Sequence, residues 1–375
     1  MQLYLKYALS LSLAFLGALV AQWLHLPIPW LLGPLFITAL LKINHAPIEC
    51  HNSARSIGLS IIGLTLGLYF TPEMIHLIAS HWLVLLIGLL FALLLGAIGA
   101  FILQRWAKVD FKTAWFASAI GGANEMSHLA EHYQARVDQV ASAHTLRVLM
   151  VVVIVPFFYQ FMGWHGFDTD QIAKHLELNW FGFFGLVLIS YIASRIFIQF
   201  KLPNPWTFGA LLVAIFFTAQ DIHLSAIPTP IIHLGQVLLG WSLGNKFKPG
   251  FFKTAPRYLS IVALCNLGAL LLTGLLAYTL MQWTDLPIAT LGLGLAPGGV
   301  AEMTITAKVL QLGVPIVTAF HVVRMVGVLG TVGYLYLFFD KILQKKIQTQ
   351  KTAIKRLISL SWCAQRDSNS RPLSS

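Results

Sequence analysis

The sequence predicts an all-α polytopic membrane protein, with about ten transmembrane helices arranged as two inverted five-helix repeats. Composition gives the first reason. Of the 375 residues, 57% are hydrophobic and only 10% are charged, whereas a soluble domain carries about 25% charged residues. Long apolar runs such as WLVLLIGLLFALLLGAIGAFIL at 82–103 give the second reason, because lipid cannot satisfy backbone groups and such a run forms a helix. The third reason is an internal duplication.

The duplication is clearest in one polar motif that occurs twice. GGANEMSHLAEHYQARVDQVASAHTLRV fills residues 121–148, and GGVAEMTITAKVLQLGVPIVTAFHVVRM fills residues 298–325. The copies align at a constant spacing of 177 residues, the separation of Glu125 and Glu302. The matching positions are Gly121/Gly298, Gly122/Gly299, Glu125/Glu302, Met126/Met303, Ala130/Ala307, His144/His321 and Arg147/Arg324. Charged groups are costly at membrane depth, so their recurrence indicates a functional site on a duplicated fold.

Two further blocks repeat in the same order along the two halves. LPIPWLLGPL at 26–35 matches LPNPWTFGAL at 202–211, and GLSIIGLTLGLYFTP at 58–72 matches GQVLLGWSLGNKFKP at 235–249. The apolar segments then predict five membrane helices in each half. They lie near 7–24, 28–43, 53–70, 80–103 and 138–163, and near 179–200, 204–219, 227–246, 257–283 and 315–339.

A shorter apolar piece separates the fourth and fifth helices of each half. These pieces, at 111–120 and 286–297, run directly into the Gly-Gly pairs and are too short to cross a membrane alone. Short, glycine-interrupted segments at corresponding positions of two repeats are typical of broken-helix binding sites in transporters. The sequence therefore predicts re-entrant, broken segments at 111–128 and 286–305.

The distribution of lysine and arginine predicts the orientation. With five crossings per half and both termini in the cytoplasm, the basic residues between helices lie inside, Arg55 and Lys246 among them, and the acidic loop 164–178 lies outside. Six crossings per half would move Lys246 and its basic neighbours outside, against the positive-inside bias. Because five is odd, the second half enters from the opposite face, and the repeat is inverted.

These boundaries predict five consecutive parts. They are a first membrane repeat at 1–163, a periplasmic linker at 164–178, a second membrane repeat at 179–340, a basic amphipathic helix at 341–358, and an unstructured or artefactual tail at 359–375. The basic helix places isoleucine and leucine on one face and lysine on the other, which suits an anionic membrane surface. A solvated basic tail that only fixes the topology is the alternative.

The Gly-Gly pairs, Gly121-Gly122 and Gly298-Gly299, predict breaks at which the backbone approaches a ligand. A helix that restarts after such a break presents free N–H groups and the positive end of its dipole. A tight crossing of two helices, which also needs small residues, is the alternative. We favour the broken helix, because irregular backbone at membrane depth usually lines a cavity.

Glu125 and Glu302 are the strongest candidates for binding a proton or a coupling cation, since a carboxylate at this depth is a functional residue by default. The alternative is a structural ion pair with Arg147 or Arg324. If such pairs form, we expect each glutamate to meet the arginine of its own half, because the connecting segment is short.

His144 and His321 each precede an arginine of the motif by three residues, so histidine and arginine share one helix face. Arginine could bind an anionic solute, and histidine titrates near neutral pH. In the alternative interpretation, Arg147 and Arg324 only neutralise the glutamates and the histidines bind backbone carbonyls.

No metal or cofactor site is predicted. His128, Glu131 and His132 spell the inverted zinc-protease motif, but the second copy lacks all three, which excludes a symmetric metal site. Polar residues that line a vestibule are the better explanation. The three cysteines show no motif spacing.

Two copies of Gly-Gly…Glu-Met…His-x-x-Arg, together with the Leu-Pro-x-Pro-Trp…Gly openings, resemble the AbrB family of bacterial inner-membrane proteins. The resemblance covers nearly the whole chain up to about residue 340. It implies a multi-pass protein of the bacterial inner membrane, in a family that carries labels such as ammonia monooxygenase and regulator of gene expression. Copper-dependent oxidation needs clustered histidine or soft ligands, which the motif does not offer.

The sequence thus favours a secondary transporter of a small solute, coupled to ions or protons, with alternating access about a midplane site. Its expected partners are the lipid bilayer and the solute, not nucleic acid, and a homo-oligomer is compatible with the pattern. No nucleotide-binding motif occurs, so an ion gradient is favoured over ATP. Two alternatives stay open: a membrane-bound regulator that acts through partners, and, less favoured, a membrane oxidoreductase.

Overall fold

The computed structural model describes residues 2–164, 178–247, 249, 251 and 255–369, and within these ranges every regular element is a helix. Helices of the first half are α1 (Gln2–Trp23), α2 (Pro29–Ile43), α3 (Asn52–Gly67), α4 (Pro72–Ser80), α5 (Trp82–Ile102), the π-helical turn η1 (Leu103–Ala107), α6 (Phe111–Ser118), α7 (Ala123–His132) and α8 (Val137–Phe161). Those of the second half are α10 (Trp180–Gln199), α11 (Pro205–Thr218), α12 (Thr229–Gly244), α14 (Pro256–Met281), α15 (Ile288–Leu295), α16 (Val300–Val309) and α17 (Val314–Asn369).

The helices of the two halves correspond in the order that the duplication predicts. Apart from α4 and η1, each helix of the first half has a counterpart one repeat later: α1 and α10, α2 and α11, α3 and α12, α5 and α14, and α6–α8 and α15–α17. The entries to α2 and α11 show how local sequence sets a boundary. Ile28 and Asn204 both adopt the left-handed backbone conformation, and the proline that follows each one starts a helix.

Among the described residues, six helices are long and apolar enough to cross a membrane: α1, α5 with η1, α8, α10, α14 and α17. A seventh span results if α3 and α4, which meet at an 89° bend, count as one broken span. The sequence predicts about ten. The difference lies in α2, α3, α11 and α12, which have 14 to 16 residues and are about 21–24 Å long, against about 30 Å of hydrocarbon.

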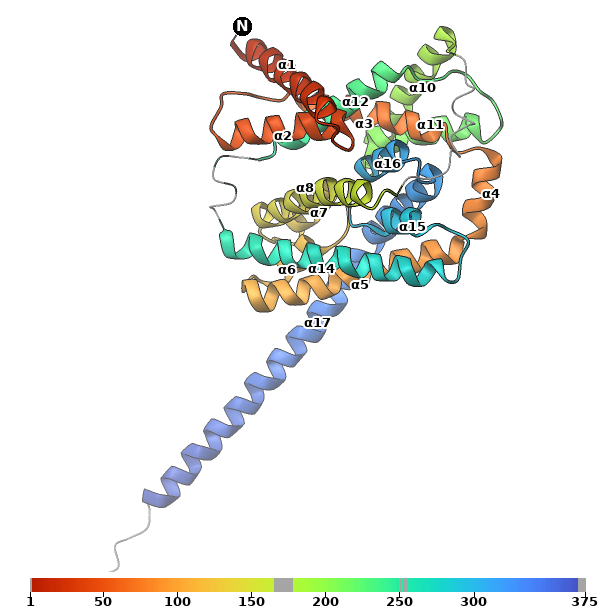
Figure 1. The fold of residues 1–375 in the computed structure, drawn as a ribbon. Coiled ribbons are helices and arrows are strands. Elements are labelled where there is room, and N and C mark those ends of the chain that lie inside the picture. The colour runs from red at the N-terminus through yellow and green to blue at the C-terminus, as the bar shows by residue number, and fades with distance from the viewer. Residues whose placement is uncertain (1, 165–177, 248, 250, 252–254, 370–375) are drawn as a thin grey trace, which may run out of the picture. The chain divides into compact units, whose positions relative to one another are not determined.

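Residues 1–329 form one compact unit in which the helices fall into two groups. A row of six runs in the spatial order α1, α2, α12, α3, α11, α10, so the halves interleave in it (Figure 1). We call it the row. The second group holds α5–α8, α14–α16 and residues 314–329 of α17, and we call it the core group. A buried apolar cluster, including Leu35, Ile62, Val151 and Met303, draws on both groups and joins them.

Glycines shared by the repeats let the helices of the row approach closely. A Cβ on Gly63 of α3 would overlap the carbonyl oxygen of Thr207 in α11, and one on Gly240 of α12 would overlap that of Leu31 in α2. Such small-residue crossings are the usual way to pack helices whose surroundings are as apolar as their side chains. A tight helix crossing, the alternative considered for the Gly-Gly pairs, is therefore found at these other repeated glycines.

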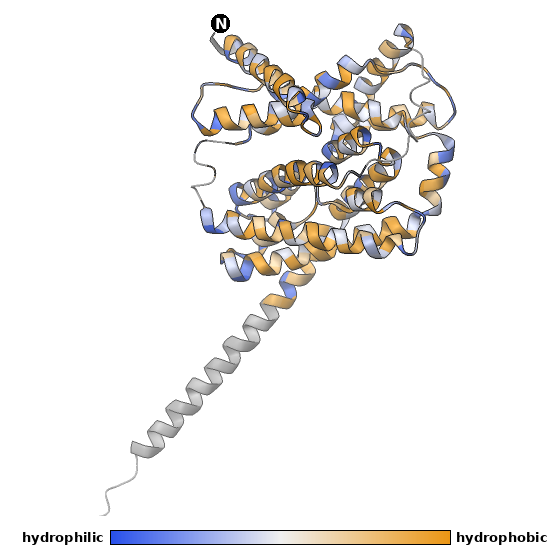
Figure 2. Cartoon of the chain, viewed as in Figure 1, coloured by the Kyte–Doolittle hydropathy of each residue, from blue (hydrophilic) through white to orange (hydrophobic). Residues whose placement is uncertain are grey.

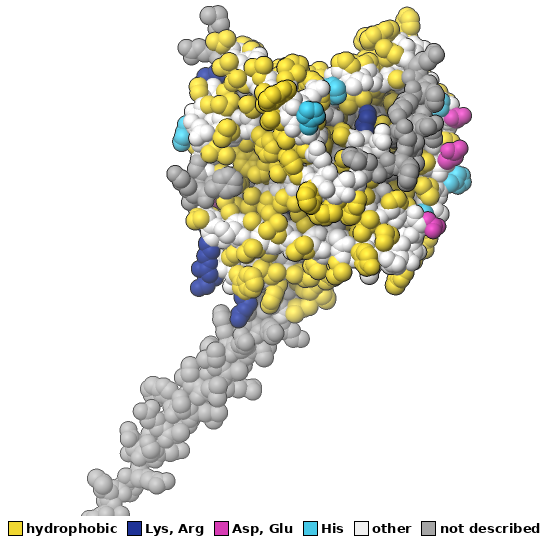
Figure 3. Space-filling model, in the orientation of Figure 1, with side chains coloured by type: hydrophobic (Ala, Val, Ile, Leu, Met, Phe, Trp, Pro, Cys, Tyr) yellow, Lys and Arg dark blue, Asp and Glu magenta, His cyan; other side chains and the backbone are white. Residues whose placement is uncertain are grey.

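The outer surface of this unit is largely apolar. Hydrophobic residues run along most helices (Figure 2) and cover most of the face seen in Figure 3, with charged side chains gathered near its margins. Phe181, Trp283 and Leu271 are among many large apolar side chains that are more than three-quarters exposed. Exposed apolar patches of this extent mark a membrane or protein interface.

Residues 330–375 form a second unit, the continuation of α17. The sequence predicts a basic helix at 341–358 and an unstructured or artefactual tail at 359–375, and α17 is assigned as helix to Asn369. Residues 334–369 contain no glycine or proline, so nothing in the backbone ends the helix earlier. Residues 370–375, and residues 165–177 of the expected periplasmic linker, lie outside the described part of the chain.

Candidate functional site

Both predicted breaks are present in the structure. Helix α6 ends at Ser118 and α7 begins at Ala123, while α15 ends at Leu295 and α16 begins at Val300. The second glycine of each pair has an extended backbone and occupies the N-cap position, so the chain leaves one short helix and immediately enters another. Each break therefore brings together a helix C-terminus, with free carbonyls, and a helix N-terminus, with free N–H groups.

The spacing of the Gly-Gly-x-x-Glu-Met motif has a steric reason. The carboxylate of Glu125 turns back over Gly122, where a Cβ would overlap it, and the side chain of Met126 occupies the corresponding space at Gly121. In the second copy, Glu302 lies in the same way over Gly299, and Met303 lies over Gly298. The first glycine thus makes room for the methionine, and the second makes room for the glutamate.

Histidine and arginine of the first copy hold the C-terminal end of α6. Nη1 of Arg147 donates to the carbonyl oxygen of Ala119 at 2.9 Å, and Nη2 donates to that of Gly121 at 3.2 Å. Nη2 also donates to Nδ1 of His144 at 2.6 Å, and the remaining ring nitrogen lies 2.8 Å from the carbonyl oxygen of Phe116. Because arginine can only donate, Nδ1 accepts, and Nε2–H donates to Phe116. The histidine is therefore a neutral positioning group.

The second copy repeats this arrangement atom for atom. Arg324 donates to the carbonyl oxygens of Ala296 at 2.5 Å and Gly298 at 2.6 Å, and to Nδ1 of His321 at 2.6 Å. Nε2 of His321 lies 3.1 Å from the carbonyl oxygen of Leu293. Each arginine places its positive charge at the negative end of a short helix and satisfies carbonyls that the break leaves free.

The alternative interpretation of Glu125 and Glu302, a structural ion pair with an arginine of the motif, is not what the structure shows. Within the described residues, no ion pair joins Glu125 or Glu302 to Arg147 or Arg324. The reason lies in the two ends of each break: the arginine binds the carbonyls of the helix that ends there, and the glutamate stays at the start of the next helix. Of the two interpretations for histidine, binding a backbone carbonyl is the one that the hydrogen bonds support.

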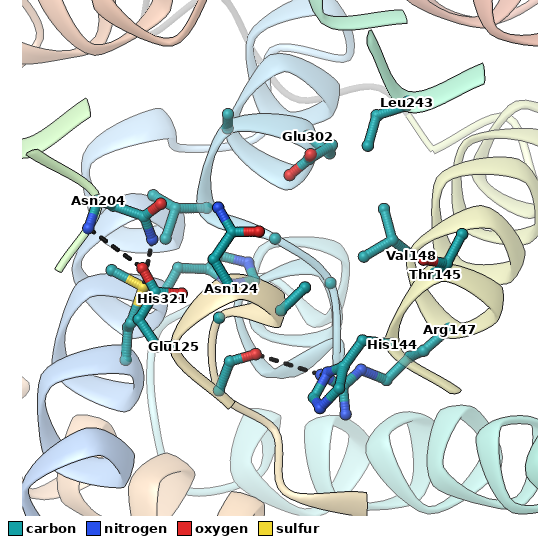
Figure 4. Close-up of a pocket in the computed structure, with 18 of the residues that line it drawn as sticks. Asn124, Glu125, His144, Thr145, Arg147, Val148, Asn204, Leu243, Glu302 and His321 are labelled. Carbon is teal, nitrogen blue, oxygen red and sulfur yellow. Dashed lines mark hydrogen bonds between the residues drawn. The ribbon is translucent and has the colours of Figure 1, made fainter. Parts of the chain in front are cut away.

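All ten predicted site residues line one cavity of about 80 Å³ (Figure 4). They are Gly121, Gly122, Glu125, His144, Arg147, Gly298, Gly299, Glu302, His321 and Arg324. Residues of the row complete the lining, including Leu35, Arg55, Leu59, Asn204, Thr207, Leu243 and Lys246. The cavity therefore lies where the two broken helices of the core group face the row.

The two glutamates have different surroundings. Glu125 is half-buried and accepts a hydrogen bond from the backbone N–H of Asn204 at 3.3 Å, which links the first half's motif to the second half's α11 (Figure 4). Glu302 is only 4% exposed, and no described residue donates a hydrogen bond to its carboxylate. Glu302 lines the cavity, so the site suits a bound proton or cation at this carboxylate.

Sequence reasoning missed the cationic contribution of the row. From the sequence, Arg55 and Lys246 indicate only which side of the membrane they lie on, yet both line the cavity. The missed signal is divergence between the copies: at the 177-residue spacing, Arg55 corresponds to Ile232 and Lys246 to Tyr69. Four cationic side chains and two carboxylates line the cavity, a formal excess of two positive charges.

The His128, Glu131 and His132 cluster lies on α7. Across the described residues, no three histidine, cysteine, aspartate or glutamate side chains are placed to hold a metal ion.

Comparison with known proteins agrees with the motif geometry. The family described as "Transition state regulatory protein AbrB" matches residues 41–340. The chain is 24% identical over 356 residues to "Uncharacterized protein YhjN" of Bacillus subtilis (strain 168), which covers 88% of this chain and 92% of that protein. It is 23% identical over 329 residues to "Putative regulator AbrB" of Escherichia coli (strain K12), covering 86% of this chain and 92% of the relative. The family match spans both broken helices and both His-x-x-Arg pairs, and the chain belongs to the AbrB family.

Proposed function

We propose that the protein is a secondary transporter that moves a small solute across a bacterial inner membrane, coupled to protons or cations. One observation carries the proposal: the two broken helices, α6–α7 and α15–α16, and the helices that follow them, α8 and α17, bring the repeated glutamates, histidines and arginines to a single cavity. Discontinuous helices that meet at a buried, charged cavity are the usual architecture of substrate sites in transporters built from repeats.

The proposed topology is the inverted one, with both termini in the cytoplasm. In it, α2, α3, α11 and α12 also cross, as short helices shielded by their neighbours in the row, which gives five crossings in each half. Arg55, Asn204 and Lys246 then all lie at cytoplasmic ends of their helices. The cavity they line would open towards the cytoplasm, as expected for an inward-facing state.

The proposed movement takes place between the row and the core group rather than between the sequence halves. Each half contributes helices to both groups, and the cavity separates the groups. A displacement of the core group relative to the row would expose the cavity to the opposite side. The link from Glu125 to Asn204 is one contact that must break in such a step.

The glutamates are the proposed sites of coupling. Glu302 lines the cavity and would carry the proton or cation, and Glu125 would sense the position of the row through Asn204. Charges that alternate between bound and unbound states at membrane depth are the usual means of coupling to an ion gradient.

The test starts from a metabolite comparison of cells that lack and cells that overproduce the protein. The metabolite that differs is then followed into proteoliposomes. Glu125→Gln and Glu302→Gln should each abolish uptake without loss of folded protein. Glu131→Gln, an exposed carboxylate on the same helix as Glu125, is the matched control and should transport normally. Equal uptake per folded molecule by all three variants would refute the coupling role.

A membrane-bound regulator is the second candidate, favoured by the name of the Escherichia coli relative. Such a protein would act through partners, and the basic stretch 341–358 is the segment to test. A regulator should keep its cellular phenotype when both glutamates are neutralised and lose it when 341–358 is deleted. A transporter should show the reverse. The oxidoreductase alternative would need a redox centre, and the transport proposal needs none.

A further inference from the structure

The cavity contains more positive charge than its own carboxylates can balance. Arg55, Arg147, Lys246 and Arg324 line it, against Glu125 and Glu302. A net charge in a low-dielectric region is unfavourable unless a partner of opposite sign is present. The cationic side chains that have no partner in the protein therefore indicate the charge of the ligand that the cavity binds.

Two of the four cations already have partners. The guanidinium groups of Arg147 and Arg324 each donate to backbone carbonyls at a helix C-terminus and to a histidine. This assigns them to holding the broken helices in place. Sequence reasoning considered these arginines as the binders of an anionic solute, but their donors point mainly to the backbone.

Arg55 and Lys246 are the two that remain. Neither side chain forms an ion pair or a hydrogen bond with any described residue, and Nη1 of Arg55 is fully buried without a partner. Both come from the row, near the start of α3 and just after the end of α12, so they face the core group across the cavity. A buried guanidinium nitrogen without an acceptor in the chain calls for a partner such as water or a ligand atom. Nε of Arg147 is in the same state, but its two other nitrogens are occupied, whereas Arg55 has no hydrogen-bond partner among the described residues.

Neither Arg55 nor Lys246 recurs at the equivalent position of the other repeat. The positions equivalent to Arg55 and Lys246 hold Ile232 and Tyr69, and the position equivalent to Asn204 holds Ile28. Ile28 and Ile232 are buried. The duplication therefore kept the glutamates, histidines and arginines of the core group twice, whereas the row carries its cations once. A single cationic face is expected for one substrate site, not for a structural element of each repeat.

Size and chemistry limit the ligand further. A cavity of about 80 Å³ holds on the order of five water molecules, which suits a carboxylate or phosphate group on a small molecule. Arginine binds both groups through paired N–H donors, and lysine adds a compact charge. The first turns of α7 and α16 also line the cavity and present the positive ends of their dipoles.

We infer that the transported solute is a small oxyanion, and that Arg55 and Lys246 bind its carboxylate or phosphate group. That the anion is transported rests on the proposed function, but its binding to Arg55 and Lys246 can be tested without measuring transport. The anion would lie opposite Glu302, so that a proton or cation bound there would offset part of its charge.

The test uses the purified full-length protein in detergent, with unfolding followed by tryptophan fluorescence. Sodium acetate and sodium phosphate are titrated at constant ionic strength set by sodium chloride, and acetamide serves as the uncharged analogue of acetate. At least one oxyanion should raise the melting temperature in a saturable manner, since a ligand that binds only the folded state stabilises it. Acetamide should have no effect. Stabilisation by neither anion would overturn the inference.

Variants assign the effect to the two residues. Arg55→Gln and Lys246→Gln should each weaken the anion's apparent affinity by roughly tenfold, the expected loss for one charged hydrogen bond. Arg195→Gln, an exposed arginine of α10 outside the cavity, is the control and should bind normally. If the neutral variants do not fold, Arg55→Lys and Lys246→Arg are used instead. They keep the positive charge and should retain most of the binding. Unchanged affinity in folded Arg55→Gln and Lys246→Gln would contradict the assignment.

Flux then separates this inference from the proposed function. Saturable anion binding without uptake of any metabolite by proteoliposomes would refute transport and leave the anion site in place. Uptake of a neutral or cationic metabolite, unaffected by Arg55→Gln, would refute the anion site and leave the transporter.

Discussion

Single residues of the motif divide the work between structure and chemistry. The two glycines leave room for side chains that follow them: Met126 fills the space in which a Cβ on Gly121 would lie, and Glu125 fills that space at Gly122. Arg147 and its histidine close the preceding helix. The arginines bind backbone carbonyls, whereas the glutamates face the cavity, which is why the glutamates are the proposed coupling residues.

The glycine under each glutamate can be tested directly. Gly122→Ala and Gly299→Ala should displace the carboxylate at little cost in unfolding free energy, because the new methyl group overlaps only the far end of the flexible glutamate side chain. Uptake should fall with the displacement. Gly274→Ala, a helical glycine with open space around it, is the control and should leave stability unchanged or slightly higher. Normal uptake in both test variants would show that the glutamates do not occupy these positions.

A charge exchange tests the absence of the glutamate–arginine pair. Glu125→Arg combined with Arg147→Glu should not regain the expression that the single changes lose. The glutamate introduced at 147 would face backbone carbonyls at the end of α6, and each of the arginine's charged hydrogen bonds that is lost costs about 1.5–3 kcal/mol. Membrane expression and melting temperature are the measurements. Recovery to the level of the unmodified protein would restore the ion-pair interpretation.

At the scale of elements, close helix crossings set the geometry of the row. Helix α3 carries Arg55 and approaches α11, which carries Asn204 and Thr207, so their separation fixes one wall of the cavity. Proline begins α2 and α11, and glycine is the last residue of α3 and α12. Their role is to position the wall, whereas the six longer helices carry most of the apolar surface.

A methyl group at the α3–α11 crossing should disturb this wall. Gly63→Ala introduces a Cβ that overlaps the carbonyl oxygen of Thr207, so the helices must separate. We expect a loss of about 1–3 kcal/mol in stability together with reduced uptake. Gly185→Ala in α10, where nothing lies within 4 Å, is the matched control. If both variants behave alike in melting and uptake assays, the crossing is not tight in the membrane.

At the scale of the whole molecule, the central question is the relation between the two repeats. The structure pairs their helices in order and brings both motifs to one cavity. Inversion is the part that depends on the membrane, and the charge distribution is its support. An inverted pair would make the two broken helices enter from opposite faces.

Equivalent tryptophans provide a test of inversion. Trp106 and Trp283 are separated by the 177-residue spacing, and both are more than half exposed. After replacement of the native cysteines, Trp283→Cys should react with a membrane-impermeant maleimide added outside the cells, and Trp106→Cys should react only after the membrane is permeabilised. Labelling of both positions from the same side would show that the repeats are parallel.

The sequence by itself determined most of the element order. Breaks at Gly121-Gly122 and Gly298-Gly299, the short helices before them and the long apolar helices all follow from glycine, proline and hydrophobic runs, which act locally. It also brought out ten of the residues that line the cavity, because a duplicated polar motif in an apolar chain needs no three-dimensional information to be noticed.

Only the tertiary structure decided which groups meet. It placed the arginines on helix carbonyls rather than on glutamates, grouped the helices into a row and a core group that ignore the boundary between the repeats, and added Arg55 and Lys246 to the cavity. These outcomes depend on contacts between residues far apart in the chain. Arg55 and Lys246 have no repeated counterpart, so nothing in the local pattern distinguishes them from loop charges.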